Sequence, residues 1–113
     1  MKIYHNPNCS KSNCALDLIK QQGFETEIIN YVNNPPSKAE LTHILKLLNK
    51  SPKEIIRQNE VLFKQNFENK DFNDEEWIDI LVKNPILIER PIVLHHGKAV
   101  IARPAEKIME LIK

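Results

Sequence analysis

Cys9 is the residue whose type and setting first suggest chemistry. It follows Asn6-Pro7-Asn8, which has the composition of a turn, and precedes a helical pattern, so it falls at or just before a first helical turn. The free N–H groups and the positive dipole end of a helix favour an anion there and lower the pKa of a thiol. His5 and Lys11 can add positive charge nearby. Because the thiolate is the reactive form, the sequence predicts that Cys9 is a nucleophile.

Three arginines provide a second chemical signal. Arg57, Arg90 and Arg103 each adjoin a boundary between expected elements, and the last two directly precede a proline. The planar guanidinium forms paired, charge-assisted hydrogen bonds and is suited to a tetrahedral oxyanion. Pro91 is a candidate for a cis peptide bond, a rare form found in tight turns. A reactive thiolate beside several arginines indicates an oxyanion substrate that is attacked at its central atom.

The second cysteine has a structural interpretation. Cys14 lies beside the apolar stripe of the first helix, which predicts that it is buried in the core. A Cys9–Cys14 disulfide is not expected, because five residues of helix separate the two Cα atoms by more than a disulfide spans. A zinc site would combine both cysteines with His5, His95 or His96, but structural zinc needs four convergent ligands. We therefore expect free thiols and no metal.

The elements that must position these residues follow the order βαβ, helical insert, ββα. The first helix is expected from Pro7 or Cys9 to about Gln22, and the last begins at Pro104. The expected strands are residues 2–4, 25–31, 92–94 and 99–101. A mostly helical insert at about 37–84 opens with capping-box spacing. Since βαβ gives parallel pairing and a hairpin gives antiparallel pairing, we predict an α/β, thioredoxin-like arrangement, a four-stranded mixed sheet with helices on both faces.

Composition limits the function classes. The 113 residues are sufficient for a single domain, 1–113, and the 42% hydrophobic content is that of a soluble globular protein. A net charge of +1 gives no electrostatic argument for nucleic acid or a membrane surface. No run has the length of a transmembrane helix or the apolar region of a signal peptide. We expect a cytoplasmic protein, where thiols stay reduced.

Together, these motifs resemble the glutaredoxin-dependent arsenate reductase family, which has a thioredoxin-like fold. The resemblance extends in order over nearly the whole chain. The matching segments are 5–12 (HNPNCSKS), 34–37 (NPPS), 57 (R), 85–93 (PILIERPIV) and 103–104 (RP).

The resemblance implies that Cys9 is a single catalytic cysteine that attacks arsenate, or a similar oxyanion, and expels water. Glutathione is then implied as the co-substrate that adds to the arsenic adduct, and glutaredoxin as the partner that completes the reduction, with no bound cofactor. We expect a monomer. The implied oxyanion-binding residues are Arg57, Arg90 and Arg103, and the supporting residues are His5, which is linked to lowering the cysteine pKa, Ser12 and the cis-proline Pro91.

Two alternatives on the same fold stay open. A redox regulator that binds RNA polymerase often carries Cys-x-x-Cys, whereas Ser12 stands at the second position here. A glutathione-dependent thiol reductase would need only Cys9 and a groove for a thiol. The chain also has Asn13-Cys14 where arsenate reductases usually have Arg-Asn, which removes a positive charge near the thiolate.

Overall fold

The computed structural model describes residues 1–112 and divides the chain into two compact units. The first unit contains residues 1–34 and the chain from residue 90 onward, and the second unit is Pro35–Glu89. The second unit corresponds to the predicted insert and extends it slightly at both ends. Among the described residues, no helix combines the length and apolar character needed to cross a membrane.

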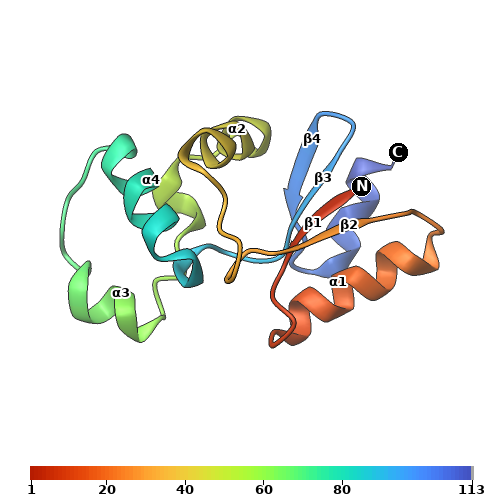
Figure 1. Ribbon diagram of the computed structural model, residues 1–113, viewed down its shortest axis with the longest axis horizontal. Helices are drawn as coiled ribbons and strands as arrows, with labels where there is room; N and C mark the ends of the chain where they lie inside the picture. Colours follow the sequence, from red (N-terminus) through yellow and green to blue (C-terminus); the bar gives the residue numbers. More distant parts are fainter. Residues whose placement is uncertain (113) are drawn as a thin grey trace. The chain divides into compact units, whose positions relative to one another are not determined.

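The first unit is built on a mixed four-stranded sheet with the strand order β2-β1-β3-β4 (Figure 1). Its strands are β1 (Lys2–His5), β2 (Glu27–Asn30), β3 (Ile92–His95) and β4 (Lys98–Ile101). β1 and β2 are parallel, whereas β3 is antiparallel to both β1 and β4. The α1 helix (Ser10–Gln21) supplies the crossover that parallel pairing requires. The predicted α/β class, mixed sheet and strand pairings are confirmed.

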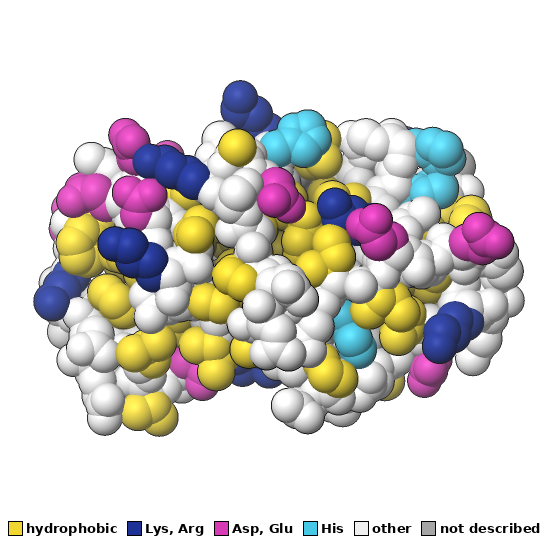
Figure 2. All heavy atoms as spheres, in the orientation of Figure 1, with side chains coloured by type: hydrophobic (Ala, Val, Ile, Leu, Met, Phe, Trp, Pro, Cys, Tyr) yellow, Lys and Arg dark blue, Asp and Glu magenta, His cyan; other side chains and the backbone are white. Residues whose placement is uncertain are grey.

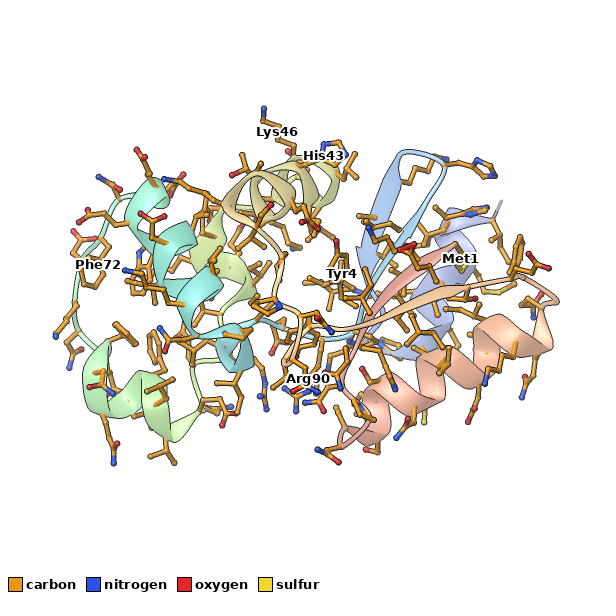
Figure 3. The ribbon with its side chains drawn as sticks, in the orientation of Figure 1. Met1, Tyr4, His43, Lys46, Phe72 and Arg90 are labelled. Atoms are coloured by element: carbon orange, nitrogen blue, oxygen red, sulfur yellow. The ribbon has the colours of Figure 1, made fainter. Side chains whose placement is uncertain are left out.

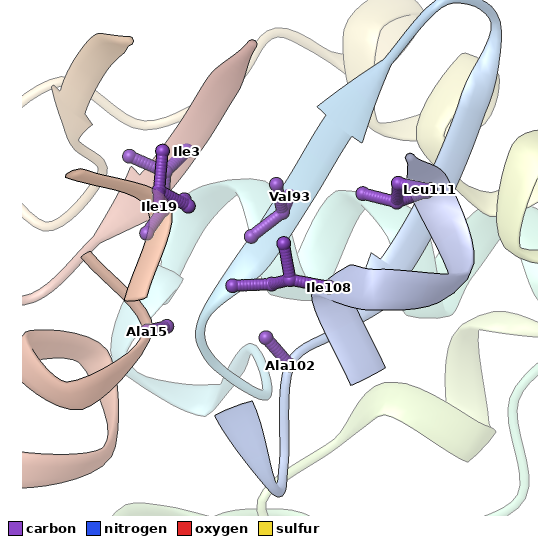
Figure 4. Packing of buried hydrophobic residues seen from close by; sticks show 7 residues of the cluster. All are labelled: Ile3, Ala15, Ile19, Val93, Ala102, Ile108 and Leu111. Atoms are coloured by element: carbon purple, nitrogen blue, oxygen red, sulfur yellow. The ribbon is translucent and has the colours of Figure 1, made fainter. Parts of the chain in front are cut away.

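Two helices pack on one face of this sheet. Ile3 of β1 and Val93 of β3 are directly opposite each other and point into a cluster formed with α1 and the 3₁₀-helix η3 (Ala105–Leu111), as Figure 4 shows. Complete burial of an isoleucine stabilises a fold by about 1.5–3 kcal/mol, so this cluster anchors α1 to the sheet. Its buried members are Ile3, Ala15, Ile19, Val93, Ala102, Ile108 and Leu111.

Two predictions about helical residues are wrong. Cys14 is exposed, because α1 buries Ser12, Ala15 and Ile19 and leaves the flank that carries Cys14 toward solvent. The apolar pattern near the C-terminus forms a 3₁₀-helix whose buried residues are Ile108 and Leu111, a spacing of three that matches three residues per turn. Pro104 precedes this helix instead of occupying its first position.

The second unit is helical, as predicted, with its own core. Its elements are α2 (Lys38–Leu48), η1 (Pro52–Ile55), α3 (Val61–Asn66), α4 (Asp74–Lys83) and η2 (Pro85–Leu87). The predicted capping box at the start of α2 is confirmed, since the Glu40 N–H donates to Ser37 Oγ (3.1 Å). Trp77 is 2% exposed and is surrounded by the rings of Phe63, Phe67 and Phe72.

Charged side chains of both signs are interspersed on the face shown in Figure 2, in keeping with the net charge of +1. Within the second unit, Lys38 of α2 forms ion pairs with Glu75 (2.8 Å) and Asp79 (3.3 Å) of α4. These side chains are about half exposed or more, so solvent screens both pairs and each adds little to the stability of the unit.

Candidate active site

The candidate residues of the first unit belong to loops at one end of its sheet. β1 ends, β3 begins and β4 ends at this point, because one row pairs Tyr4, the last but one residue of β1, with Ile92 and Ile92 with Ile101. The Ala102 N–H, just after β4, donates to the Pro91 carbonyl oxygen, just before β3 (2.9 Å). The loops that carry Cys9, Arg90 and Arg103 therefore leave the sheet at the same end.

The loop between β1 and α1 is held by its own hydrogen bonds. The Cys9 N–H donates to the Asn6 carbonyl oxygen (3.0 Å), and the Asn8 N–H donates to Asn6 Oδ1 (3.0 Å). The hydroxyl of Ser12, which is fully buried, accepts a hydrogen bond from the Asn6 N–H (3.1 Å). The predicted turn at residues 6–8 is confirmed, and it places Cys9 at the N-cap of α1 with an extended backbone (φ −111°, ψ 121°).

Cys9 is 8% exposed, and the pKa of its thiol is lowered. Burial raises the pKa of this thiol, but the backbone N–H of Ser12, the Arg90 guanidinium and the backbone N–H of Lys11 together lower the pKa by more. The two N–H groups belong to the first turn of α1, where no carbonyl within the helix is available to accept from them. The lowered pKa that the sequence predicts is confirmed, and it increases the fraction of reactive thiolate at neutral pH.

Arg90 is half-buried, and Figure 3 shows it close to the start of α1. Its guanidinium stabilises the Cys9 thiolate. Among the described residues, no hydrogen-bond partner is present for its buried Nε and Nη1 atoms. A buried charged donor without an acceptor is unfavourable, so an anion bound beside Cys9 would be stabilised by these two groups.

The Arg90–Pro91 peptide bond is cis, which confirms the prediction for Pro91. The Arg103–Pro104 bond is also cis, which the sequence did not indicate. Arg103 is half-buried, and its backbone N–H donates to the Ile101 carbonyl oxygen (2.9 Å). Both candidate arginines of this unit thus directly precede a cis proline.

His5 is buried at the end of β1, 6% exposed, and its Nδ1 has no hydrogen-bond partner among residues 1–112. Burial lowers the pKa of this imidazole, and the positive charge of Lys20 lowers it further. His5 is therefore largely neutral at pH 7. The positive charge that stabilises the thiolate comes from Arg90, not from His5.

Arg57 belongs to the second unit, immediately after η1. Its backbone N–H donates to the Leu87 carbonyl oxygen (2.7 Å). Its Nη1 donates to Glu60 Oε1 (2.7 Å) and to the Ile86 carbonyl oxygen (3.1 Å), and its Nε lies 3.8 Å from Glu89 Oε1. The structure thus gathers Cys9, Ser12 and Arg90 around one thiol, whereas Arg57 is held by carboxylates of the other unit.

Glu60 and Glu89 are the partners of Arg57, and sequence reasoning did not identify them. The local sequence carried little signal for this pair, because Glu60 stands three residues after Arg57 across a turn and not within one helix. Among residues 1–112, no group of three or more His, Cys, Asp and Glu side chains is arranged to hold a metal ion, and both cysteines are free thiols. His95 and His96 are in ring contact at the β3–β4 turn (4.0 Å between centroids).

A sequence model of the ArsC family matches residues 4–111, nearly the whole chain. The chain belongs to the ArsC family. ArsC family members of known structure include the arsenate reductase from Vibrio cholerae, which is 36% identical and superposes with a TM-score of 0.92, covering 98% of both chains. The predicted thioredoxin-like fold of this ArsC chain is therefore confirmed.

Sequence relatives of this ArsC chain include one protein without an assigned activity and one named enzyme. The chain is 44% identical to the uncharacterised protein YfgD of Escherichia coli K12 (99% of this chain and 96% of YfgD). It is 37% identical to an arsenate reductase of Neisseria meningitidis (96% of this chain and 94% of that protein).

Proposed function

We propose that this protein is a thiol-dependent arsenate reductase with Cys9 as its nucleophile. The observation that carries the proposal is the pairing of an activated thiol with an anion-binding group. The pKa of Cys9 is lowered, and the adjacent Arg90 has two buried donor atoms without partners among the described residues. The arsenate reductases among its relatives, with 36–37% identity over nearly the full chain, support arsenate as the oxyanion.

The reaction begins with attack of the Cys9 thiolate on arsenic. A sulfur–arsenic bond forms, an arsenic–oxygen bond breaks, and the leaving oxygen departs as water after protonation. Glutathione adds to the arsenic with loss of a second water. A glutaredoxin thiolate then removes the glutathione sulfur from arsenic as a mixed disulfide, and the electron pair of the broken sulfur–arsenic bond reduces arsenic to the +3 state. Water cleaves the remaining Cys9 sulfur–arsenic bond and releases arsenite, so that arsenate and two thiols give arsenite, one disulfide and one water overall.

The arginines supply the electrostatic part of the proposal. Arg90 binds an arsenate oxygen and offsets the charge that develops as the thiolate attacks. Arg103 lies just after β4, at the same end of the sheet, and is a second hydrogen-bond donor to the oxyanion. Arg57 is a third donor. Arg57 belongs to the other unit, and its role here is supported by the resemblance of its segment to the family motif. Pro91 fixes the segment next to Arg90, and His5 stays neutral beside the loop.

Glutathione is proposed as co-substrate and glutaredoxin as protein partner, and the protein needs no bound cofactor. We further propose that it is a cytoplasmic monomer. The positions of the two cysteines support a thiol donor from another molecule. Cys14 lies on the exposed flank of α1, and a disulfide between Cys14 and Cys9 would require the first turn of the helix to unwind.

Arsenate-dependent oxidation of glutathione in the presence of glutaredoxin tests the proposal, with Cys9→Ser compared with Cys14→Ser. Turnover should disappear in Cys9→Ser and persist in Cys14→Ser, which is the matched control. Loss of turnover in both variants would mean that Cys14 resolves the adduct. Absence of arsenate turnover in the wild type, with activity on mixed disulfides, would replace the proposal with a glutathione-dependent thiol reductase.

A further inference from the structure

Asn13 connects the first turns of α1 to the chain that precedes the helix. Its backbone N–H donates to the Cys9 carbonyl oxygen (3.1 Å), which is an ordinary helical bond. Its side-chain Nδ2 donates to the Pro7 carbonyl oxygen (3.1 Å) and so reaches back six residues. Asn13 is exposed, so burial does not hold the side chain in this place. The contact with Pro7 is therefore the feature of Asn13 that can matter for the loop.

The carbonyl that Asn13 binds belongs to the central peptide of a β-turn. Pro7 and Asn8 are the central residues of this turn, and the Cys9 N–H closes it on the Asn6 carbonyl oxygen (3.0 Å). The φ of Asn8 is not positive, so the turn is type I. The sequence also permits type II, because proline suits the first central position and asparagine tolerates a positive φ at the second. The two types differ in the orientation of the central peptide.

Both polar groups of this peptide are hydrogen-bonded to asparagine side chains. The Asn8 N–H donates to Asn6 Oδ1 (3.0 Å), and the Pro7 carbonyl oxygen accepts from Asn13 Nδ2. Because the peptide group is planar and trans, its N–H and C=O point in opposite directions, and reversal of the peptide would break both bonds. Asn6 and Asn13 therefore select one of the two turn types that the sequence permits.

Two side chains of α1 hold this turn against the helix. The buried Ser12 hydroxyl accepts from the Asn6 N–H (3.1 Å), and the exposed Asn13 donates to the Pro7 carbonyl oxygen. Cys9 is the residue that joins the turn to the helix, so these two contacts restrict its φ and ψ. The direction of the Cys9 side chain follows from these angles, because the allowed χ1 rotamers depend on φ and ψ.

The direction of the Cys9 sulfur matters because fixed groups activate the thiol. The backbone N–H groups of Ser12 and Lys11 and the Arg90 guanidinium lower the pKa of Cys9. Hydrogen bonds weaken steeply as their alignment is lost. A turn that pivots on the helix would leave the sulfur with weaker contacts, and the pKa of the thiol would return toward its ordinary value.

We propose that Asn13 is a positioning residue that holds the Pro7–Asn8 peptide in one orientation and thereby keeps the Cys9 sulfur aligned with the N–H groups at the start of α1. The inference deepens the proposed function and rests on it, because it concerns the same nucleophile. Asn13 carries no charge, so its effect on the thiol passes through the geometry of the turn.

The pH profile of iodoacetamide alkylation tests this role without any turnover. The parent is Cys14→Ser, which leaves one thiol, and alkylation is followed by intact mass. Asn13→Leu removes the donor at nearly constant size and charge, and leucine is the better helix former, so the variant does not weaken α1. Gln21→Leu, at an exposed amide in the last position of α1, is the matched control. ¹⁵N relaxation dispersion at the Asn8 amide reports reorientation of the peptide in microseconds to milliseconds.

Asn13→Leu should raise the alkylation midpoint and slow alkylation at pH 7 by about threefold, the effect of one modest hydrogen bond, and the Asn8 amide should show exchange. Gln21→Leu should match the parent in both measurements. An unchanged midpoint in Asn13→Leu, a raised midpoint without exchange at Asn8, or equal shifts in the two variants overturns the positioning role and leaves the nucleophile standing. If the parent already has the midpoint of an ordinary thiol, the activated nucleophile of the proposed function is itself wrong.

Discussion

Cys9 and Cys14 lie five residues apart and have opposite environments. Cys9 is 8% exposed at the N-cap of α1 and has a lowered pKa, whereas Cys14 is exposed on the flank of the same helix. The thiol with the lowered pKa is therefore the buried one of the two. At the residue scale, the identity of the nucleophile depends on N–H groups and on one guanidinium rather than on exposure.

Replacement of Arg90 by glutamine should raise the pKa of Cys9. An adjacent positive charge typically shifts the pKa of an anion by about 1 unit or more, so the loss should move the thiolate midpoint upward and slow alkylation at pH 7. The pH profile of iodoacetamide alkylation in a Cys14→Ser background measures this. Lys98→Gln, which removes an exposed charge at the start of β4, should leave the midpoint in place. Identical midpoints in both variants would contradict the role of Arg90.

His5 should make the fold sensitive to acid. Burial, with the charge of Lys20, lowers its pKa below the ordinary value of 6.5, so the unfolded chain binds more protons than the folded chain below that pH. The contribution to stability is complete above about pH 6.5 and is lost as pH falls toward the folded pKa. Urea unfolding at pH 7 and pH 5 should therefore show a smaller loss of stability in His5→Gln than in the wild type.

The control for His5→Gln is the same substitution at a histidine outside the core. His43→Gln, on the exposed side of α2, should lose as much stability as the wild type between the two pH values. Equal losses in all three proteins would show that His5 does not titrate with unfolding.

At the scale of elements, the loop between β1 and α1 is the part that defines the site. Ser12 closes this loop from inside the first turn of α1, because its buried hydroxyl accepts from the Asn6 N–H (3.1 Å). The helix is in turn anchored to the sheet by Ala15 and Ile19. The position of Cys9 thus depends on packing about two and three turns further along the helix.

Ser12→Ala should destabilise the protein by about 1–3 kcal/mol, because it leaves the Asn6 N–H without its acceptor. Urea unfolding followed by circular dichroism measures the change. Ser10→Ala, at the exposed first residue of α1, is the matched control and should have a much smaller effect. Equal stability of the two variants would mean that water replaces the hydroxyl at no cost.

The difference between local and tertiary signals explains which elements were predictable. The capping box at Ser37 and the turn before Cys9 depend on neighbouring residues and were predicted. The exposure of Cys14 depends on which flank of α1 meets the sheet, and hydrophobic spacing alone does not fix that flank.

At the scale of the whole molecule, the proposed site residues are distributed over both units. Cys9, Arg90 and Arg103 belong to the first unit and Arg57 to the second. The chain passes between the units twice, from Asn34 to Pro35 and from Glu89 to Arg90. The sequence indicated all three arginines as candidates. It did not indicate that Arg57 is held by Glu60 and Glu89, because pairing of residues 55–57 with 87–89 is a long-range contact.

Binding of phosphate should slow hydrogen exchange in both units. We expect protection of residues 6–12 and of residues 55–57 and 87–89, since ordering by an anion reduces local opening. Hydrogen exchange with mass spectrometry, with potassium chloride at equal ionic strength as the control, measures it. Protection confined to the first unit would exclude Arg57 from the site.

Trp77 is the single tryptophan of the chain, and its ring is enclosed by Phe63, Phe67 and Phe72 of the second unit. Intrinsic tryptophan fluorescence therefore reports on the helical insert alone and is blind to the unit that carries Cys9. A denaturation curve followed by this emission describes one half of the protein. Coincidence of its midpoint with that from circular dichroism would mean that the two halves unfold as a single cooperative body.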